Sequence, residues 1–454
     1  MFDLIVIGAG PGGYVAAICA AQKGMKVACI EKGETLGGTC LNVGCIPSKA
    51  LLHSSEYYAR IAKEGEEHGI IAESVRADLS RMMERKNGVV KGLTEGIAFL
   101  FKKNKVEWIK GSAAFVSPKA VSVEGKTHEA KNILIATGSE PIALPFLPFD
   151  EKYVVSSTGA LELNKVPKKL LIVGAGVIGL ELGSVYRRLG SAVEVVELLD
   201  RVIPPFDGAL SKQAEQIFKK QGMKFHLSTK VVSGKVERGK VSLELENETL
   251  KGDVALISIG RKPYTKDLAL DKAGISLNEK GQIPVDNAFR TAAPSVYAIG
   301  DVIDGPMLAH KASEEGIAVI DHLTGETSHL NYIAIPNVMY TWPEVAAVGM
   351  TEEEAKAHNL SLLVGTFSFR ANPRARCSGD AEGIVKVIGE KKTGKLLGMH
   401  IIGPSASEMI GEGVLALEKG LTLKELAHAS HAHPTCSEAI KEASLAALGK
   451  PLHS

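Results

Sequence analysis

The residues Phe2–Gly13 read FDLIVIGAGPGG, and this stretch decides the fold of the N-terminal part of the chain. Phe2–Ile7 is an apolar run typical of a buried strand, and Gly8, Gly10 and Gly13 follow it with the spacing G-x-G-x-x-G. The first glycine permits a tight turn, the second lets the backbone approach a pyrophosphate, and the third lets a helix pack on the strand. The stretch predicts a strand, a phosphate-binding turn and a helix N-terminus with free N–H groups.

The residues after this turn extend the unit. Gly13–Lys23 is compatible with a helix, and Lys26–Ile30 is a second apolar run typical of a buried strand. Glu31 closes that run eighteen residues after Gly13, where a carboxylate can accept hydrogen bonds from ribose hydroxyls. This combination predicts a dinucleotide-binding unit rather than a lone tight turn.

A second unit of the same kind begins 166 residues after the first. It consists of the predicted strand Lys169–Val173, the turn glycines Gly174, Gly176 and Gly179, the predicted helix Leu180–Leu189 and the predicted strand Ala192–Val196. Glu197 follows, and an acid there favours a free 2′-hydroxyl, which predicts a preference for NAD over NADP. Two such units predict hydride exchange between two cofactors, because one bound nicotinamide needs only one unit.

Composition and charge exclude several classes of protein. The chain has 454 residues, 45% of them apolar, which suits about three domains. Its net charge of +1 gives no excess to attract nucleic acid, an anionic membrane or an acidic partner. It contains no apolar run of about 18 residues and opens with no basic leader. We expect a cytoplasmic protein with neither a nucleic-acid nor a membrane partner.

Cys40 and Cys45 are the close pair among six cysteines, and they follow Glu31 shortly after the first unit. A helix beginning near Cys45 would place its thiolate at the positive end of the helix dipole and lower the thiol pKa. Lys49 lies one turn further on the same face. In a reducing cytosol this pattern favours catalytic thiols over a structural disulfide. Zinc or iron–sulfur spacings are missing, so we expect no metal.

The stretch Gly37–Lys49, GGTCLNVGCIPSK, resembles the active-site signature of the pyridine nucleotide–disulfide flavoenzymes, in the branch that oxidises dihydrolipoyl groups. The resemblance covers essentially the whole chain. It extends to both glycine units and to the runs Ile135–Ser139, Ile259–Arg261, Val296–Val302 and His431–Thr435.

The resemblance implies an α/β fold class, with two Rossmann-like dinucleotide-binding domains plus an α+β C-terminal dimerisation domain. FAD would lie on the first unit and NAD on the second. Asp301 would hold the ribityl chain, the Met307–Ala309 backbone would lie near the flavin, and Lys49 would pair with Glu181 beside it. The implied cofactor-binding positions are Gly8, Gly10, Gly13, Glu31, Lys49, Ala113, Thr137, Gly138, Asp301, Met307, Leu308, Ala309, Gly174, Gly176, Gly179, Glu197, Val231 and Gly260.

His433 matches the catalytic histidine of the family, and Glu438 matches the carboxylate that orients it. A dithiol must lose a proton before it attacks a disulfide, so the chemistry needs such a base. In the family this histidine comes from the other subunit of a homodimer. The resemblance therefore implies oxidation of dihydrolipoyl groups to lipoyl groups by NAD⁺ through a redox-active Cys40–Cys45 disulfide. The substrate would be the lipoyl-bearing protein of a 2-oxoacid dehydrogenase or glycine cleavage complex.

Three positions depart from the family pattern, namely Ala113, Tyr264 and Cys436. Cys436 is open to two interpretations, a reactive thiol or a packed one; the cysteines outside the Cys40–Cys45 pair are expected to pack. The alternative functions are a glutathione reductase-like or mercuric reductase-like enzyme, or a flavoprotein redox sensor. Glu197 argues against the first, and the absence of a terminal cysteine pair argues against the second.

The predicted domain organisation has four segments. They are an FAD-binding domain at 1–143, an NAD-binding domain at 144–264, a central segment at 265–335 that completes the FAD site, and a dimerisation domain at 336–454.

Overall fold

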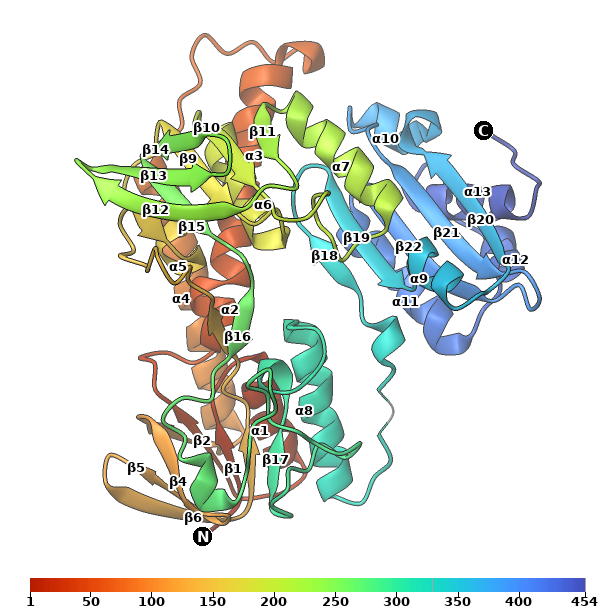
Figure 1. Ribbon diagram of the computed structural model, residues 1–454. Coiled ribbons are helices and arrows are strands. Elements are labelled where there is room, and N and C mark those ends of the chain that lie inside the picture. Colours follow the sequence, from red (N-terminus) through yellow and green to blue (C-terminus); the bar gives the residue numbers. More distant parts are fainter. Residues whose placement is uncertain (329, 454) are drawn as a thin grey trace.

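The computed structural model describes residues 1–328 and 330–453. Figure 1 shows three lobes, each built on its own sheet, with the N-terminus in the lowest lobe and the C-terminus in the right-hand one. No helix in the described part of the chain has the length and apolarity needed to cross a membrane.

The N-terminal sheet is built around β1, whose bounds, Phe2–Ile7, confirm the predicted strand. Leu4, Ile5 and Val6 are completely buried. The strand order is β3-β2-β1-β6-β5-β4, with β17 also paired to β6. These strands are β2 (Val27–Glu31), β3 (Glu107–Lys110), β4 (Ala113–Ser117), β5 (Ala120–Val123), β6 (Lys126–Ile135) and β17 (Val296–Ala298). Because β17 pairs in parallel with β6, residues near 296 return to the N-terminal lobe.

Helices α1 (Pro11–Gln22) and α8 (Ala309–Leu323) pack against each other beside this sheet (Figure 1). The predicted helix began at Gly13, but α1 begins two residues earlier, because a proline in the first turn lacks only an N–H that would be unpaired there anyway. A Cβ at Gly12 would lie 2.8 Å from the carbonyl oxygen of Ala312, so the two helices approach closely.

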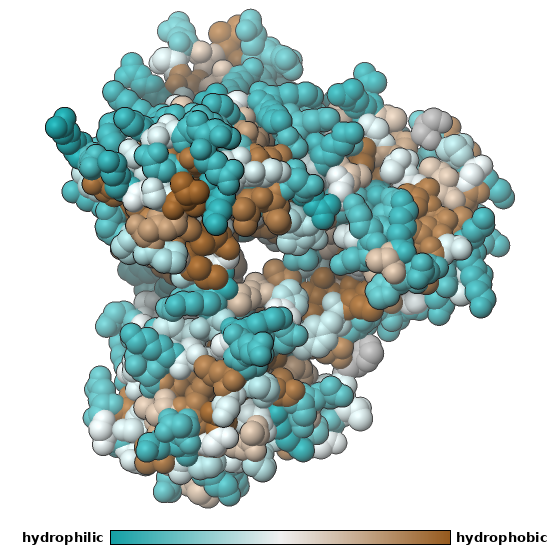
Figure 2. Space-filling model, viewed as in Figure 1, coloured by the Kyte–Doolittle hydropathy of each residue, from teal (hydrophilic) through white to brown (hydrophobic). Residues whose placement is uncertain are grey.

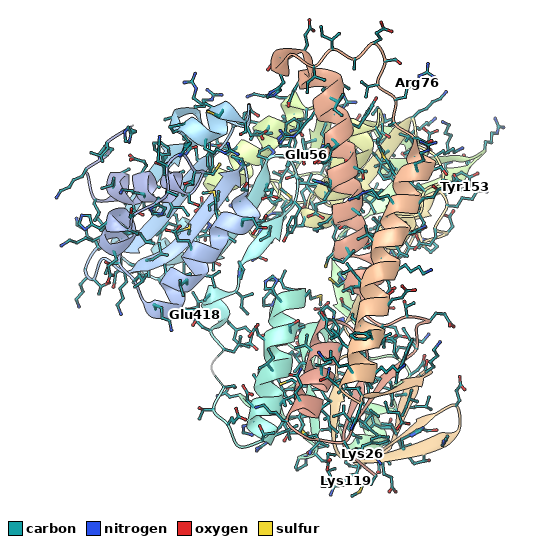
Figure 3. All side chains as sticks on the ribbon, turned by 180° about the vertical axis from the view of Figure 1, so that it is seen from behind. Lys26, Glu56, Arg76, Lys119, Tyr153 and Glu418 are labelled. Carbon is teal, nitrogen blue, oxygen red and sulfur yellow. The ribbon has the colours of Figure 1, made fainter. Side chains whose placement is uncertain are left out.

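Two long helices, α3 (Cys45–Glu64) and α4 (Leu79–Lys103), lie side by side and run from the N-terminal lobe to the second one (Figure 3). A short helix, α2 (Gly38–Val43), precedes α3. The N-terminal lobe and the middle lobe are therefore joined by helices as well as by the chain between the sheets.

The second sheet has five parallel strands in the order β11-β10-β9-β15-β8. Its strands are β8 (Val154–Val155), β9 (Lys169–Val173), β10 (Ala192–Val196), β11 (Met223–His226) and β15 (Val254–Ile257). Strands β9 and β10 confirm their predicted bounds, whereas helix α6 spans Val177–Arg188 and begins three residues before the predicted Leu180. A glycine N-cap, Gly176, allows the helix to begin directly after the turn.

The C-terminal sheet is antiparallel, in the order β18-β19-β22-β21-β20. Its strands are β18 (Asn337–Met339), β19 (Glu344–Gly349), β20 (Leu362–Ser368), β21 (Ile384–Glu390) and β22 (Leu396–Gly403). Helices α11 (Ala406–Lys419) and α13 (Glu438–Ala447) pack on it, and α7 (Gly208–Lys220) of the second lobe also contacts β22. Together the three sheets confirm the predicted fold class, two α/β units and an α+β C-terminal unit; the first sheet is mixed, since β5 pairs antiparallel with β4 and β6.

The remaining elements are short or lie at the edges. They are α5 (Ser157–Ala160), α9 (Glu352–Ala357), α10 (Pro373–Cys377), α12 (Leu423–His428), the pair β7 (Ser139–Pro141) and β16 (Arg261–Pro263), the antiparallel strands β12 (Val231–Glu237), β13 (Lys240–Leu245) and β14 (Thr249–Gly252), and the 3-10 turns Glu66–His68, Leu270–Ala273, Gly300–Val302, Tyr332–Ala334 and Phe369–Ala371. The antiparallel β7–β16 pair links the first two lobes.

Candidate active site

The two glycine turns have the same geometry. Gly8 and Gly174 have φ values of +99° and +102°, a region that favours glycine. A Cβ at Gly13 or Gly179 would overlap a backbone oxygen of its own turn. A Cβ at Gly10, by contrast, would meet nothing within 4 Å. The first and third glycines are therefore needed for the turn and for helix packing, whereas the second leaves open space in front of the helix N-terminus, as a pyrophosphate requires.

The acids that end the second strands bind the turns in equivalent ways. Glu31 accepts hydrogen bonds from Ala9 N at 2.8 Å and from Gly33 N at 2.8 Å. Glu197 accepts them from Ala175 N at 2.7 Å and from Leu199 N at 2.9 Å. Each carboxylate oxygen keeps a second acceptor position, so the acids hold the loops and still have capacity for ribose hydroxyls.

Both turns open into one cavity of about 1870 Å³. Figure 2 shows the molecule hollowed between its lobes, with apolar residues along the hollow. The expected site residues that line this cavity are Gly8, Gly10, Glu31, Cys40, Cys45, Lys49, Thr137, Gly138, Gly174, Gly176, Glu181, Glu197, Val231, Gly260, Asp301, Met307, Leu308 and Ala309. Residues from the two nucleotide-binding units, from the segment around 301–309 and from the thiol pair therefore meet at one place.

Five expected site residues do not line the cavity: Gly13, Ala113, Gly179, His433 and Glu438. Gly13 and Gly179 lie behind the turns, where they permit helix packing. Ala113 is 7% exposed on β4 and belongs to the apolar core of the first lobe. Its side chain therefore packs inward from the sheet, and its role in cofactor binding stays a prediction.

The thiol pair is held by close backbone contacts. A Cβ at Gly38, at the start of α2, would lie 2.6 Å from Gly10 Cα, so α2 rests directly on the first glycine turn. A Cβ at Gly44 would lie 2.8 Å from Thr39 O and 3.2 Å from Cys40 Cα. These two glycines, which the sequence reasoning missed, let Cys40 on α2 approach Cys45 at the first position of α3.

Cys40 and Cys45 are present as thiols, and their pKa values move in opposite directions. The hydrogen bond between the two sulfurs, together with burial, raises the pKa of Cys40. The same hydrogen bond lowers the pKa of Cys45 to about 7; burial opposes this effect and the charge of Lys49 supports it. Cys45 is thus the sulfur that carries negative charge near neutral pH, as expected for a thiol at a helix N-terminus.

Lys49 on α3 donates hydrogen bonds to both carboxylate oxygens of Glu181 on α6, at 3.0 and 2.8 Å. Glu181 is buried, with 4% of its side chain exposed, and it also accepts a hydrogen bond from Tyr340 N at 2.9 Å. The expected pair of Lys49 and Glu181 therefore exists in the structure, and one residue of the C-terminal unit joins it.

Asp301 lies in a hydrogen-bonded chain with two residues that had no assigned role. Ser139 donates to Asp301 at 2.5 Å, and Arg261 donates to the Ser139 hydroxyl and carbonyl oxygens, both at 2.7 Å. Burial lowers the pKa of Arg261. The family-like runs containing Ser139 and Arg261 marked these residues in the sequence, but only folding shows that they position Asp301.

His433 and Glu438 form the expected pair, but the pair lies outside the large cavity. His433 Nδ1 lies 2.9 Å from Glu438 Oε1, and Glu438 Oε2 accepts a hydrogen bond from Thr435 N at 2.9 Å. Burial would raise the pKa of Glu438, but these hydrogen bonds hold it below its ordinary value. The His433 side chain is 69% exposed, so the imidazole is open to solvent on the C-terminal lobe.

Of the four cysteines that were expected to pack, three are buried or partly buried and one is exposed. Cys29 is fully buried, and Cys19 and Cys436 are partly buried against apolar clusters. Burial raises the pKa of Cys436, which favours the packed interpretation over the reactive one. Cys377 is exposed at the end of α10, so its expected packing role is wrong.

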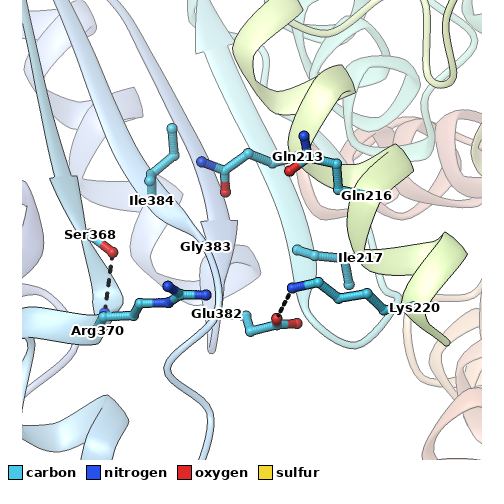
Figure 4. Close-up of a pocket in the computed structure, with 9 residues that line it drawn as sticks. All are labelled: Gln213, Gln216, Ile217, Lys220, Ser368, Arg370, Glu382, Gly383 and Ile384. Carbon is cyan, nitrogen blue, oxygen red and sulfur yellow. Dashed lines mark hydrogen bonds and ion pairs between the residues drawn. The ribbon is translucent and has the colours of Figure 1, made fainter.

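A second, smaller cleft of about 270 Å³ lies between α7 and the C-terminal sheet (Figure 4). Lys220 and Glu382 form a 2.9 Å ion pair across it. None of the expected site residues lines this cleft. The thiol pair and both nucleotide-binding turns therefore lie at the large cavity, and the His433–Glu438 pair lies apart from both pockets.

A dithiol that is to be oxidised needs an electron acceptor, and two nucleotide-binding turns open onto this dithiol. The fold and the site thus define a nucleotide-linked dithiol–disulfide oxidoreductase. Family models agree: residues 2–316 match the pyridine nucleotide–disulphide oxidoreductases, and residues 335–444 match the dimerisation domain of the same proteins. The chain belongs to this family; it is an enzyme, and FAD and NAD are its cofactors.

Similar proteins narrow the class. The mitochondrial dihydrolipoyl dehydrogenase of Schizosaccharomyces pombe is 52% identical, over 100% of this chain and 91% of that protein. The dihydrolipoyl dehydrogenase of Manduca sexta is 52% identical, over 99% and 94%. Among solved structures, the HOCl-induced flavoprotein disulfide reductase RclA of Escherichia coli is 30% identical, with a TM-score of 0.88 over 97% of this chain and 99% of that one.

Proposed function

We propose that the chain oxidises dihydrolipoyl groups carried by another protein to lipoyl groups, with NAD⁺ as electron acceptor. The observation that carries the proposal is the pair Cys40 and Cys45, which lies on the first glycine turn and shares one cavity with the second turn. Relatives named dihydrolipoyl dehydrogenase, 52% identical over the full chain, support the same substrate and favour none of the alternatives.

In the proposed reaction, a base removes a proton from one substrate thiol, and the thiolate attacks Cys40 Sγ of the Cys40–Cys45 disulfide. The Cys40–Cys45 bond breaks, a mixed disulfide forms, and Cys45 leaves as a thiolate. The second substrate thiolate then displaces Cys40 and closes the lipoyl ring. The electron pair now resides on the two cysteines.

The residues around Cys45 suit this role. The N-terminus of α3 and the ammonium of Lys49 stabilise its thiolate, and Glu181 keeps Lys49 in place. The chemistry that bound FAD would supply here is two-electron transfer, between the thiol pair on one side and the nicotinamide of NAD⁺ on the other. Gly10, Asp301 and the Met307–Ala309 backbone would hold the FAD, and Gly176 and Glu197 the NAD.

For the base, we propose the partner subunit's His433 in a homodimer. Within one chain His433 does not line the cavity, and its exposed imidazole lies on a unit that matches a dimerisation domain. Glu438 would orient the imidazole and stabilise the imidazolium. The substrate arm would come from a lipoyl-bearing protein of a 2-oxoacid dehydrogenase or glycine cleavage complex.

For the compartment, we propose the cytoplasm, where thiol pairs outside catalytic sites stay reduced. The S. pombe relative is named as mitochondrial, so the competing expectation is a mitochondrial enzyme. Fractionation of source cells decides between the two.

The deciding experiment is an anaerobic titration of the purified protein with dihydrolipoamide, followed by addition of NAD⁺. We expect a visible flavin band, a long-wavelength shoulder from a thiolate beside the flavin, and one NADH formed per dihydrolipoamide consumed. Rapid reduction by NADPH followed by reoxidation by glutathione disulfide, with no response to dihydrolipoamide, would instead assign a glutathione reductase-like enzyme. Slow or absent turnover with every dithiol tested would instead favour the alternative function of a flavoprotein redox sensor.

A further inference from the structure

Tyr340 contacts both members of the Lys49–Glu181 pair. Its aromatic ring lies under the Lys49 ammonium, with Nζ 4.6 Å from the ring centroid, and its backbone N–H donates to Glu181 Oε1 at 2.9 Å. A cation over an aromatic face is attracted by the ring quadrupole, so the ring limits where the ammonium can go.

The three residues come from three separate parts of the fold. Lys49 lies on α3 of the first lobe, Glu181 on α6 of the second, and Tyr340 in the turn after β18 of the C-terminal lobe. Through this turn, the unit that matches a dimerisation domain contacts Lys49, whose charge lowers the pKa of Cys45.

We propose that Tyr340 is a positioning residue, which fixes the Lys49 ammonium beside the Cys45 thiolate and so couples the C-terminal unit to the reactivity of the thiol pair. The geometry stands without any substrate; only the consequence for turnover rests on the proposed function. The Tyr340 hydroxyl makes no hydrogen bond to any residue that the structure describes, so the ring is the part of the side chain that acts.

Besides Lys49, several ionisable groups interact electrostatically with Cys45 or Tyr340. They are Cys40 on α2, Glu181 on α6, Arg261 on β16 and Glu344 on β19. Substitution of the Tyr340 ring leaves all four in place and preserves the backbone hydrogen bond to Glu181. A changed Cys45 titration in such a variant therefore reports on the position of Lys49.

The test uses FAD-containing protein with Cys40→Ser, in which Cys45 is the single thiol of the pair. The pH midpoint of its long-wavelength thiolate absorbance is measured without substrate. We expect Tyr340→Leu to raise the midpoint, with about threefold less thiolate below the midpoint, because Lys49 is less well held. Tyr340→Phe keeps the ring and should keep the midpoint.

Two further variants separate positioning from general damage. Pentafluorophenylalanine at position 340 keeps the ring size but removes its negative face, and it should raise the midpoint as Leu does, even if the Leu variant folds poorly. Tyr264→Leu is the matched control, because that ring also lines the cavity but lies 3.6 Å from a different ammonium, Lys32.

Three results would overturn the proposal: an unchanged midpoint in both the Leu and fluorinated variants, an equal shift in Tyr264→Leu, or a further shift by Tyr340→Leu when Lys49→Gln is already present. Since no step of this test involves a dithiol substrate, the proposal can fail while the proposed function stands. Equally, a protein that does not oxidise dihydrolipoamide can still show the expected shift.

Discussion

The ammonium of Lys49 lies 2.8 Å from Glu181 Oε2, although 132 residues separate the two in the chain. One comes from the helix that starts at Cys45 and the other from the helix behind the second glycine turn. This pair therefore joins the two nucleotide-binding units next to Cys45, the sulfur with the lowered pKa.

Lys49→Met and Glu181→Gln should move the pKa of Cys45 in opposite directions. The charge of Lys49 lowers the pKa of Cys45 and the charge of Glu181 raises it, so Lys49→Met should raise the value from about 7 and Glu181→Gln should lower it. The rate of iodoacetamide labelling of Cys45 in the reduced protein, followed against pH by peptide mass spectrometry, measures both. Shifts of the same sign would contradict the assigned electrostatics.

His433→Gln should slow reduction by dihydrolipoamide by about 10²–10⁴-fold, because the thiol loses its proton acceptor. Reduction of the flavin by NADH should survive, since that half-reaction does not use the base. Stopped-flow measurement of the two half-reactions checks this. His431→Gln is the matched control, because His431 pairs with Glu412 instead. Equal loss of both half-reactions would reject the role.

Gly44→Ala should separate the two sulfurs. A Cβ at Gly44 would lie 2.8 Å from Thr39 O, so α2 must shift and carry Cys40 away from Cys45. We expect at least tenfold slower disulfide formation in the reduced protein, measured by loss of titratable thiols under an oxidant, from the sensitivity of reacting groups to about 1 Å of misplacement. Gly88→Ala, on the exposed face of α4 with nothing within 4 Å, should leave the rate unchanged. Normal oxidation of the Gly44 variant would show that α2 adjusts freely.

Glu197→Gln should narrow the preference for NAD⁺ over NADP⁺ by about tenfold, because a negative charge no longer faces the 2′-phosphate. Steady-state kcat/KM with each nucleotide provides the measurement. Glu31→Gln changes the equivalent position of the other turn and should leave this ratio unaltered. If the Glu197 variant keeps the original ratio, the carboxylate serves only to hold Ala175 and Leu199.

Asp207 and Lys386 form a buried pair between α7 and β21, with Nζ 2.9 Å from both carboxylate oxygens. Burial alone would raise the pKa of Asp207, but the hydrogen bonds from Lys386 and Glu352 N hold it below its ordinary value. Asp207→Asn should therefore cost about 3 kcal/mol of stability at pH 7, and Lys219→Met, in an exposed pair, about 0.5 kcal/mol or less.

The lowered pKa of Asp207 determines how its contribution to stability changes with pH. A carboxyl with a lowered pKa in the folded state stabilises the fold above its unfolded pKa of about 3.9 and loses that contribution as pH falls through the folded value. Calorimetric Tm values of wild type and Asp207→Asn should converge below about pH 4. A constant difference from pH 7 to pH 3 would contradict the assignment.

The sequence predicted most of what depends on local order. The strands Phe2–Ile7, Lys169–Val173 and Ala192–Val196 have their predicted bounds, because buried parallel strands are short continuous apolar runs. Helix starts were placed two or three residues late, since glycine and proline read as turn residues although both are tolerated at a helix start. The sequence also predicted a helix that begins near Cys45 with Lys49 one turn further, and α3 begins at Cys45 itself.

What the sequence by itself determined is therefore the two glycine turns, the acids that end their strands and the thiol pair, because each depends on residues close together in the chain. Only the tertiary structure decided which distant side chains meet: Tyr340 with Lys49, and Arg261 with Ser139. These contacts depend on how lobes pack, and an exposed or partly buried side chain carries no periodic signal of its distant neighbour. His433 lies away from Cys45 in one chain for the same reason, because its place is set by packing between units rather than by the spacing of its motif.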